Sequence, residues 1–292
     1  MQDEPSRLMF RTGQGDWEAC AIDLDRIRAA AEGWRRQLAG VERPWLCWNV
    51  DPDWCLVQQR LVRAVGWTPV VGFDPRVGAP ARVDPAAVLV DFNAELDLPT
   101  MYPHFPLEFT FLFAPRLAFW HSDLLVRIEK MRRIADLFAA LQDGETAAVP
   151  ERRLRHLLTP HKTRYWELIG CTTRGASQSQ FEHGCGWWMN FWFHPNHPER
   201  GSPRLSKYNW DHGSGVMYWH RHCNGKVRDL SLVELEEGHF SQIGKTDYKR
   251  VSPTHYMRNM GAELSLNYEL AACTRKLDLE WLLSADPASA AA

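Results

Sequence analysis

The residues best suited to chemistry in this chain are His121, Ser122 and Asp123, a polar cluster within the apolar run of residues 109–126. The run has the composition of a strand that is buried on both faces. A carboxylate at the end of such a strand is costly to bury unless hydrogen bonds, a cation or a metal ion offset its charge. In open α/β sheets, ligands bind outside the carboxyl ends of the strands. Asp123 therefore has two interpretations, as a ligand-site carboxylate or as the cap of the next helix or turn.

A second group of candidate residues lies in the segment 165–197, which is dense in Gly, Cys, Trp and His. Residues 175–180 are small and polar, as in a loop that lets a ligand approach its backbone. Gly184 and Gly186 lie just before Trp187 and Trp188, so we expect a tight turn that presents two large rings.

The elements that must position these residues are strands and helices that alternate through the first half of the chain. The expected strands are residues 45–50, 68–73, 87–92, 109–126 and 146–149, and the expected helices are 23–38, 56–65 and 128–141. Further strands are expected at 216–220 and 230–235. This alternation predicts an α/β fold, a single domain with a mostly parallel, mixed central sheet flanked by helices.

Composition narrows the range of functions. The formal net charge is −2 and there is no long run of Lys or Arg, so nucleic acid is not expected as a main partner. No apolar run is long enough for a transmembrane segment, and the first residues lack the order of a signal peptide. The seven cysteines are odd in number and show no CxxC, which favours reduced thiols in a cytoplasmic protein.

Three segments taken together resemble glycosyltransferases of the GT-A fold, whose single α/β domain binds a nucleotide-sugar with a divalent ion. Residues 121–123 (His-Ser-Asp) end an apolar run, where that class carries its Asp-x-Asp metal motif. Residues 181–184 (Phe-Glu-His-Gly) resemble its Phe-Asn-x-Gly segment on the acceptor side. Residues 239–245, which begin His-Phe and end Gly-Lys, resemble its late His-Phe…Gly-x-x-Lys segment.

The resemblance implies a glycosyltransferase that moves a sugar from a nucleotide-sugar donor to a carbohydrate or another hydroxyl acceptor. It implies a divalent ion, Mn or Mg, held by His121, Asp123 and His239. Oxygen and imidazole nitrogen suit such ions better than thiolate does. Lys245 and Arg174 would contact the phosphates of the donor.

The remaining assignments concern the donor's base or ribose and the acceptor. Residues at the ends of the early strands would bind the base or ribose, and these are Asn49, Asp51 and Asp74. The stacking wall for an acceptor would be Trp187 and Trp188, with a core role as the alternative. Glu182 or His183 would remove the acceptor's proton, and an ordinary loop carboxylate is the alternative for Glu182.

The same resemblance divides the chain into parts. Residues 1–40 are expected as an N-terminal helical extension, and residues 41–284 as the GT-A-like domain. The donor half would cover residues 41–150 and the acceptor half residues 160–284. Residues 285–292 are expected as a disordered tail.

One departure from the GT-A pattern leaves alternatives open. His121 stands where that class has Asp, so the protein would use a softer ion, work without metal or have lost catalysis. A different function is a zinc or iron protein built on the later histidines and a cysteine, which are His194, His197, His212, His220, His222 and Cys223. On a strand, His220 and His222 would face the same way. A third alternative is a noncatalytic carbohydrate-binding protein on the same fold.

Overall fold

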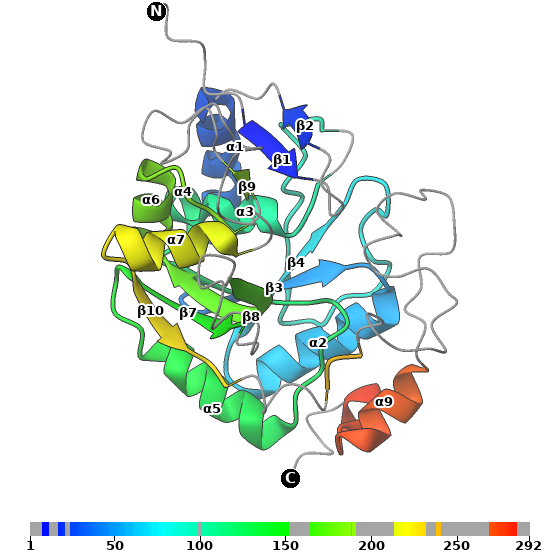
Figure 1. The fold of residues 1–292 in the computed structure, drawn as a ribbon. Helices are drawn as coiled ribbons and strands as arrows, with labels where there is room; N and C mark the ends of the chain where they lie inside the picture. The colour runs from blue at the N-terminus through cyan, green and yellow to red at the C-terminus, as the bar shows by residue number, and fades with distance from the viewer. Residues whose placement is uncertain are drawn as a thin grey trace, which may run out of the picture.

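The computed structural model describes residues 8–11, 17–20, 24–98, 101–151, 164–187, 189–190, 213–231, 238–240 and 269–284. A seven-stranded sheet in the order β10-β7-β8-β6-β3-β4-β5 forms its centre (Figure 1). Its strands are β3 (Pro44–Asn49), β4 (Thr68–Phe73), β5 (Val88–Leu89), β6 (Arg116–Trp120), β7 (Glu145–Pro150), β8 (Tyr165–Thr173) and β10 (Lys226–Asp229). A smaller antiparallel sheet joins β1 (Leu8–Arg11), β2 (Trp17–Cys20) and β9 (Met189–Asn190).

One strand of the large sheet runs against the others. β8 is antiparallel to both of its neighbours, β6 and β7, while the other neighbouring pairs are parallel. The predicted α/β fold with a mostly parallel, mixed sheet is therefore confirmed.

Helices lie on both sides of this sheet (Figure 1). One face is covered by α2 (Pro52–Ala64) and α5 (Ile128–Ala139), with α9 (Leu270–Lys276) and the 3-10 helix η5 (Glu280–Leu283) beside α2. On the other side lie α1 (Leu24–Gln37), α3 (His104–Glu108), α4 (Thr110–Phe113), α6 (Arg174–Glu182) and α7 (Ser214–His222).

Burial on both faces explains the sequence of β3, in which every residue is buried. Successive side chains of a strand point to opposite faces. Trp45 contacts Phe138 of α5 with ring centroids 5.2 Å apart, whereas Trp48 stacks on Phe92 at 6.5 Å. Phe92 in turn lies 5.3 Å from Trp34 of α1, so the two tryptophans of one strand belong to two helix layers.

The segment expected as an N-terminal extension contributes to this core. Ile27, Ala30, Ala31 and Trp34 of α1 are buried in the same cluster as the sheet residues. Helix α1 thus packs into the same core as the sheet. The expected tail, residues 285–292, lies outside the described residues.

Two predicted boundaries in the first half were wrong for local reasons. The run 109–126 is not one strand, because α4 occupies its start and β6 begins only at Arg116. Ala114 precedes a proline and is extended (φ −138°, ψ 151°), which ends the helix. Helix α2 begins at Pro52 rather than residue 56, because Asp51 caps it and proline is well suited to the first helical position.

Two predictions in the second half were also wrong. The small polar segment 175–180 is helical, since it forms part of α6 with Ala176, Ser177 and Gln180 on its buried side. The expected strand 216–220 belongs to α7, in which buried Val216 and Trp219 lie three residues apart, a helical spacing. The expected strand 230–235 lies mostly outside the described residues, and β10 ends at Asp229.

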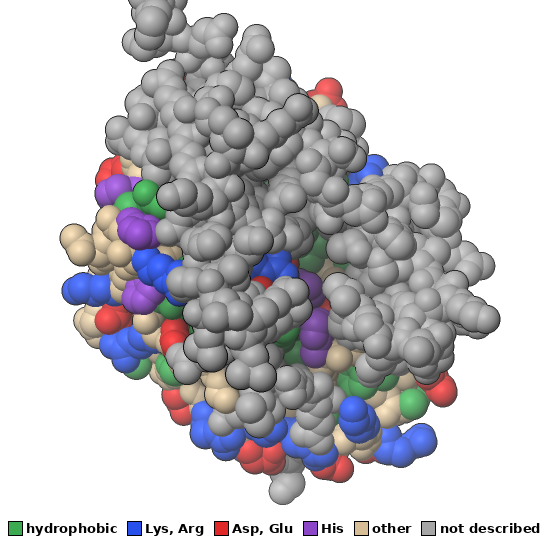
Figure 2. All heavy atoms as spheres, in the orientation of Figure 1, with side chains coloured by type: hydrophobic (Ala, Val, Ile, Leu, Met, Phe, Trp, Pro, Cys, Tyr) green, Lys and Arg blue, Asp and Glu red, His purple; other side chains and the backbone are tan. Residues whose placement is uncertain are grey.

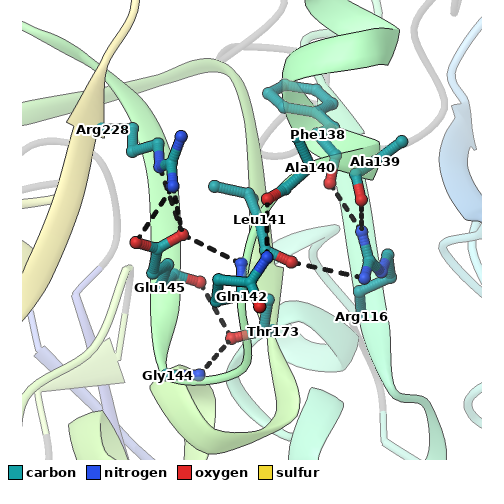
Figure 3. A network of polar contacts seen from close by, with 10 residues as sticks. All are labelled: Arg116, Phe138, Ala139, Ala140, Leu141, Gln142, Gly144, Glu145, Thr173 and Arg228. Carbon is teal, nitrogen blue, oxygen red and sulfur yellow. Dashed lines mark hydrogen bonds and ion pairs between the residues drawn. The ribbon is translucent and has the colours of Figure 1, made fainter.

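A polar network ties together the edge of the sheet where β6 begins (Figure 3). Arg116 donates hydrogen bonds to the carbonyl oxygens of Phe138, Ala139 and Leu141 at the end of α5. Last-turn carbonyls have no partner within their own helix, so this guanidinium satisfies them. Arg228 of β10 pairs with Glu145 of β7 in the same network.

Candidate metal centre

The strand order reverses between β3 and β6. The chain passes from β3 through β4 to β5 on one side, and then returns to place β6 on the other side of β3. In open α/β sheets, the crevice outside the carboxyl ends of the strands at such a point is the usual ligand site. Asn49 ends β3, and residues 121–124 follow the end of β6.

The turn after β6 is held by a helix on one face of the sheet and by a neighbouring strand. The N–H of His121 donates to the carbonyl oxygen of Leu168 in β8 at 2.9 Å. The amide Nε2 of Gln58 in α2 donates to the carbonyl oxygens of His121 and Leu124 at 2.8 and 2.9 Å. These contacts position His121 and Asp123 at the carboxyl end of the strand.

A segment distant in sequence completes the group. His239 forms an isolated antiparallel bridge with Leu124. Leu125 N donates to Gly238 O at 3.0 Å, and Phe240 N donates to Asp123 O at 3.1 Å. The Phe240 ring packs edge-on against Trp54 of α2, with centroids 5.7 Å apart. Backbone pairing and an aromatic anchor therefore hold His239 beside Asp123.

His121, Asp123 and His239 together form a group that could hold a metal ion, with one ligand atom from each lying within 4.8 Å of the others. Asp123 Oδ1 is 3.3 Å from His121 Nδ1 and 3.5 Å from His239 Nε2. Two atoms bonded to one ion at about 2.0–2.2 Å lie no more than roughly 4.5 Å apart, and both distances satisfy this limit. The prediction that Asp123 and His239 face one another is confirmed.

Two buried atoms of this group support a bound cation. Asp123 Oδ1 and His239 Nε2 are both buried, and neither has a hydrogen-bond partner within the described residues. Leaving buried polar atoms unsatisfied is costly, so such atoms point to a missing partner. A carboxylate oxygen and two imidazole nitrogens are also a chemically suitable donor set for divalent ions. The residues therefore fit a metal ion.

The charges of the group are strongly coupled. Burial opposes the charged form of both Asp123 and His121. For Asp123, the effect of burial is outweighed by His121 and His239, which hold the pKa of the carboxyl well below its usual range. For His121, the effect of burial is outweighed by Asp123 and Glu167, which raise the pKa of the imidazole to about 10.

Glu167 is a residue of this site that the sequence did not indicate. It lies in β8, and its Oε1 is 3.5 Å from His121 Nε2. Its position follows from the antiparallel pairing of β8 with β6, in which Trp120 faces Ile169. No strand was expected at residues 165–173, and a single glutamate there carries no local signal of this pairing.

The residues expected to bind the nucleotide-sugar differ in how many of their polar atoms are still free to form a hydrogen bond. Asn49 is buried and donates from Nδ2 to Gly78 O at 3.1 Å, while its Oδ1 has no partner in the described part of the chain. Asp51 caps α2 by accepting from the N–H groups of Asp53 and Trp54. Of these two residues, Asn49 is therefore the better placed to accept a hydrogen bond from a ligand.

Asp74 is fully buried and already engaged. Its two oxygens accept from Arg76 Nε and Nη2, each at 2.8 Å, and from the backbone N–H groups of Arg76 and Met101. These contacts join the turn after β4 to the segment that precedes α3. Asp74 thus has a structural role, and no contact within the described part of the chain joins this carboxylate to the metal group.

Arg174, Glu182 and His183 belong to α6 and its end, away from the metal group. Arg174 follows β8 at the edge where β6 begins, because β8 is antiparallel, and its N–H donates to Pro115 O at 2.9 Å. Glu182 is exposed, and His183 Nδ1 lies 2.7 Å from Ser179 O. Figure 1 shows α6 well separated from α9, beside which residues 238–240 pack. Their predicted roles gain no support from this placement.

The predicted aromatic wall is only partly described. Trp187 is 1% exposed and meets Phe119 of β6 edge-on at 4.8 Å, which favours the core interpretation because a buried ring offers no face to a sugar. Trp188 and Lys245 lie outside the described residues.

The alternative site on the later histidines loses its geometric basis. His220 and His222 lie on helix α7 rather than on a strand, so they do not face the same way, and both are exposed. The only metal-compatible group among the described residues is the one formed by His121, Asp123 and His239. His194, His197 and His212 lie outside the described residues.

Figure 2 shows histidine side chains near the centre of one face, with acidic and basic side chains close by, and other histidines at its left edge.

Comparison with protein-family models, curated proteins and solved structures finds no match to this chain. No helix among the described residues is both long and apolar enough to cross a bilayer.

Proposed function

We propose that this protein is a divalent-metal-dependent glycosyltransferase that takes a sugar from a nucleotide-sugar donor. The observation that carries the proposal is the position of the His121–Asp123–His239 group at the reversal of strand order in a mostly parallel sheet. That is where α/β proteins bind phosphate-bearing ligands. The resemblance of residues 121–123 and 239–245 to the GT-A class supplies the reaction type.

The chemistry of such a transfer matches the group. A nucleotide-sugar leaves as a nucleoside diphosphate, and a bound divalent ion stabilises the charge that develops on it. His121, Asp123 and His239 would hold the ion, Mn or Mg. The unsatisfied Oδ1 of Asn49 would accept a hydrogen bond from the base or ribose of the donor.

Some of the other predicted roles remain part of the proposal. Lys245 would contact phosphate, and the acceptor would be a carbohydrate or another hydroxyl compound. Arg174, Glu182 and His183 lie away from the metal group and are not part of it. The odd number and scattered spacing of the cysteines favour the cytoplasm as the compartment.

The donor set itself favours a second candidate function. Two histidines and one carboxylate that leave coordination positions open are the ligand set typical of non-haem Fe(II) oxygenases. Iron would then be the resident metal, and the open positions would bind an oxidisable substrate rather than a diphosphate.

A binding screen separates the two candidates. Metal-depleted protein is titrated with UDP, GDP, CDP and ADP, each with and without Mn²⁺, and thermal unfolding is followed. A glycosyltransferase should be stabilised by one diphosphate in the presence of Mn²⁺, by about 2.7 kcal/mol at a hundredfold excess over its dissociation constant. The matching nucleotide-sugars should then be hydrolysed slowly without acceptor, and a noncatalytic protein would bind them without turnover.

Two variants make the screen specific. Asp123→Asn removes a metal ligand and should abolish the Mn²⁺-dependent effect of the nucleotide. Asp84→Asn removes another buried carboxylate, one that pairs with Arg63 away from the group, and should leave that effect intact. Tight binding of Fe(II) with no response to any nucleotide would reject the glycosyltransferase and favour the second candidate.

A further inference from the structure

The imidazole of His121 lies between two carboxylates from different parts of the sheet. Its Nδ1 is 3.3 Å from Asp123 Oδ1, and its Nε2 is 3.5 Å from Glu167 Oε1. Asp123 belongs to the candidate metal group, whereas Glu167 does not. The two ring nitrogens therefore face two different environments.

The position of Glu167 is fixed by the backbone. β8 pairs with β6 up to Trp120 opposite Ile169, and the next N–H, that of His121, donates to Leu168 O at 2.9 Å. The Glu167 side chain is only 10% exposed, so its charge is placed in a largely buried position beside His121. Burying a carboxylate is costly unless it is paired, and the imidazole is a suitable partner.

We infer that Glu167 is a positioning residue of the metal centre, which accepts a hydrogen bond from Nε2–H of His121 and so commits Nδ1 to the metal ion. A metal-bound histidine commonly donates its other N–H to a carboxylate, which fixes the ring and makes it a better ligand. The inference rests on the metal centre of the proposed function and adds a residue to it.

The arrangement also excludes a direct ligand role for Glu167. Ligand atoms of His121, Asp123 and His239 all lie within 4.8 Å of one another, and Glu167 does not join this set. Its Oε1 approaches His121 Nε2 at 3.5 Å, on the other side of the ring from the 3.3 Å contact of Nδ1 with Asp123. Glu167 thus acts through His121.

The test measures Mn²⁺ binding without nucleotide, by calorimetry on the full chain. Glu167→Ala should weaken Mn²⁺ binding by about tenfold to a hundredfold. Glu167→Gln keeps the size and an acceptor oxygen, so it should fold and lose less affinity than Glu167→Ala. Glu151→Gln is the matched control and should bind Mn²⁺ like the wild type. Glu151 directly follows β7 and is also a buried carboxylate, but it pairs with Arg164 at 2.8 Å.

A spectroscopic readout separates positioning from general destabilisation. Zn²⁺ serves as a diamagnetic probe, and the ¹⁵N signals of His121 are assigned by their loss in His121→Gln. In the wild type and in Glu167→Gln, these signals should show that Nδ1 binds the metal and that Nε2 is protonated. The inference would be overturned if both Glu167→Ala and Glu167→Gln bound Mn²⁺ as tightly as the wild type. It would also be overturned if Nε2 bound the metal in the wild type.

The outcome is distinguishable from a failure of the proposed function. If the wild type binds Mn²⁺ and turns over a nucleotide-sugar while both Glu167 variants bind Mn²⁺ normally, only the role of Glu167 is rejected. If the wild type does not bind Mn²⁺ at all, the role of Glu167 and the metal centre are rejected together, and turnover of a nucleotide-sugar is then measured in the presence of a chelator.

Discussion

At the scale of single residues, the two carboxylates beside His121 set its protonation state. Burial disfavours the imidazolium, but the nearby carboxylates of Asp123 and Glu167 raise the pKa of His121 to about 10. Without metal the imidazole is therefore protonated at neutral pH. The positive charge of the imidazolium then neutralises part of the negative charge of Asp123 and Glu167. A bound metal ion would take over this role.

Metal affinity should consequently rise with pH. A ligand histidine must lose the proton from the ligating nitrogen, so each bound ion should release a proton from His121 below pH 10. We expect Mn²⁺ affinity to increase by up to about tenfold per pH unit between pH 6 and 8, as for displacement of one proton. Calorimetry in buffers of different ionisation enthalpy measures the released proton directly. An affinity independent of pH would contradict this charge state of His121.

Cys223 offers a second prediction at this scale. A hydrogen bond from the Cys185 thiol lowers the pKa of Cys223 to about 7, with help from the charge of His183 and against partial burial. Burial raises the pKa of Cys47, Cys55 and Cys171. Because the thiolate is the nucleophile, Cys223 should be alkylated faster than those three by iodoacetamide at pH 7.

The matched variants for this prediction are Cys185→Ala and Cys171→Ala. The first removes the hydrogen bond to Cys223 and should slow alkylation of Cys223 at pH 7, and the second should have no effect. Peptide mass spectrometry after timed labelling measures both rates. Equal rates in the wild type and Cys185→Ala would show that Cys185 does not activate Cys223.

At the scale of elements, the site depends on how closely residues 238–240 approach the turn after β6. A Cβ added at Gly238 would clash with the carbonyl oxygen of Leu125. Because that oxygen belongs to the backbone, the clash can be relieved only by a backbone shift. The Leu277 side chain of the C-terminal region lies on the same side, at 3.2 Å from that Cβ. Glycine at 238 is therefore required for the pairing that places His239.

Gly238→Ala should weaken Mn²⁺ binding by at least tenfold and lower the melting temperature, because the backbone pairing that carries His239 must move. Gly33→Ala is the control. Gly33 is in helix α1, its added Cβ would meet only the flexible side chains of Glu95 and Arg36, and alanine favours a helix by about 1 kcal/mol. The control should bind Mn²⁺ normally and melt no lower than the wild type. Normal Mn²⁺ binding by Gly238→Ala would contradict the assigned position of His239.

At the scale of the whole molecule, a metal ion would join parts of the chain that are distant in sequence. The turn after β6 supplies two ligands, and residues 238–240, which also contact α2 and Lys276 of α9, supply the third. An ion bound only by the folded protein stabilises it by mass action.

Adding Mn²⁺ to chelator-treated protein should therefore raise the melting temperature, on the order of 5 °C at a hundredfold excess over the dissociation constant. His239→Gln should abolish this shift. His222→Gln should preserve it, because His222 is an exposed residue of α7 outside the group. A shift lost in His222→Gln but kept in His239→Gln would move the metal site to the later histidines.

The sequence by itself determined the elements whose signals are local. Continuous apolar runs predicted β3 and β4, and helical periodicity predicted α1 and α5. Both signals are local, because a buried strand or a buried helix face leaves its pattern in neighbouring residues. Asp123 was identified as a site candidate for the same reason, since a carboxylate after a buried strand needs a partner. The cap at Asp51 had a local signal as well, the following proline, but Asp51 was assigned to the base or ribose of the donor.

Tertiary structure alone decided which distant residues meet. Glu167 reaches His121 only because β8 runs antiparallel to β6 in one register, and a shift of one residue would turn Glu167 to the other face. The sequence left Trp187 open between a stacking wall and a core residue, and packing against Phe119 favours the core. Helix α7 shows the same limit, because its apolar and aromatic residues suit a strand or a buried helix, and the packing around them selects between the two.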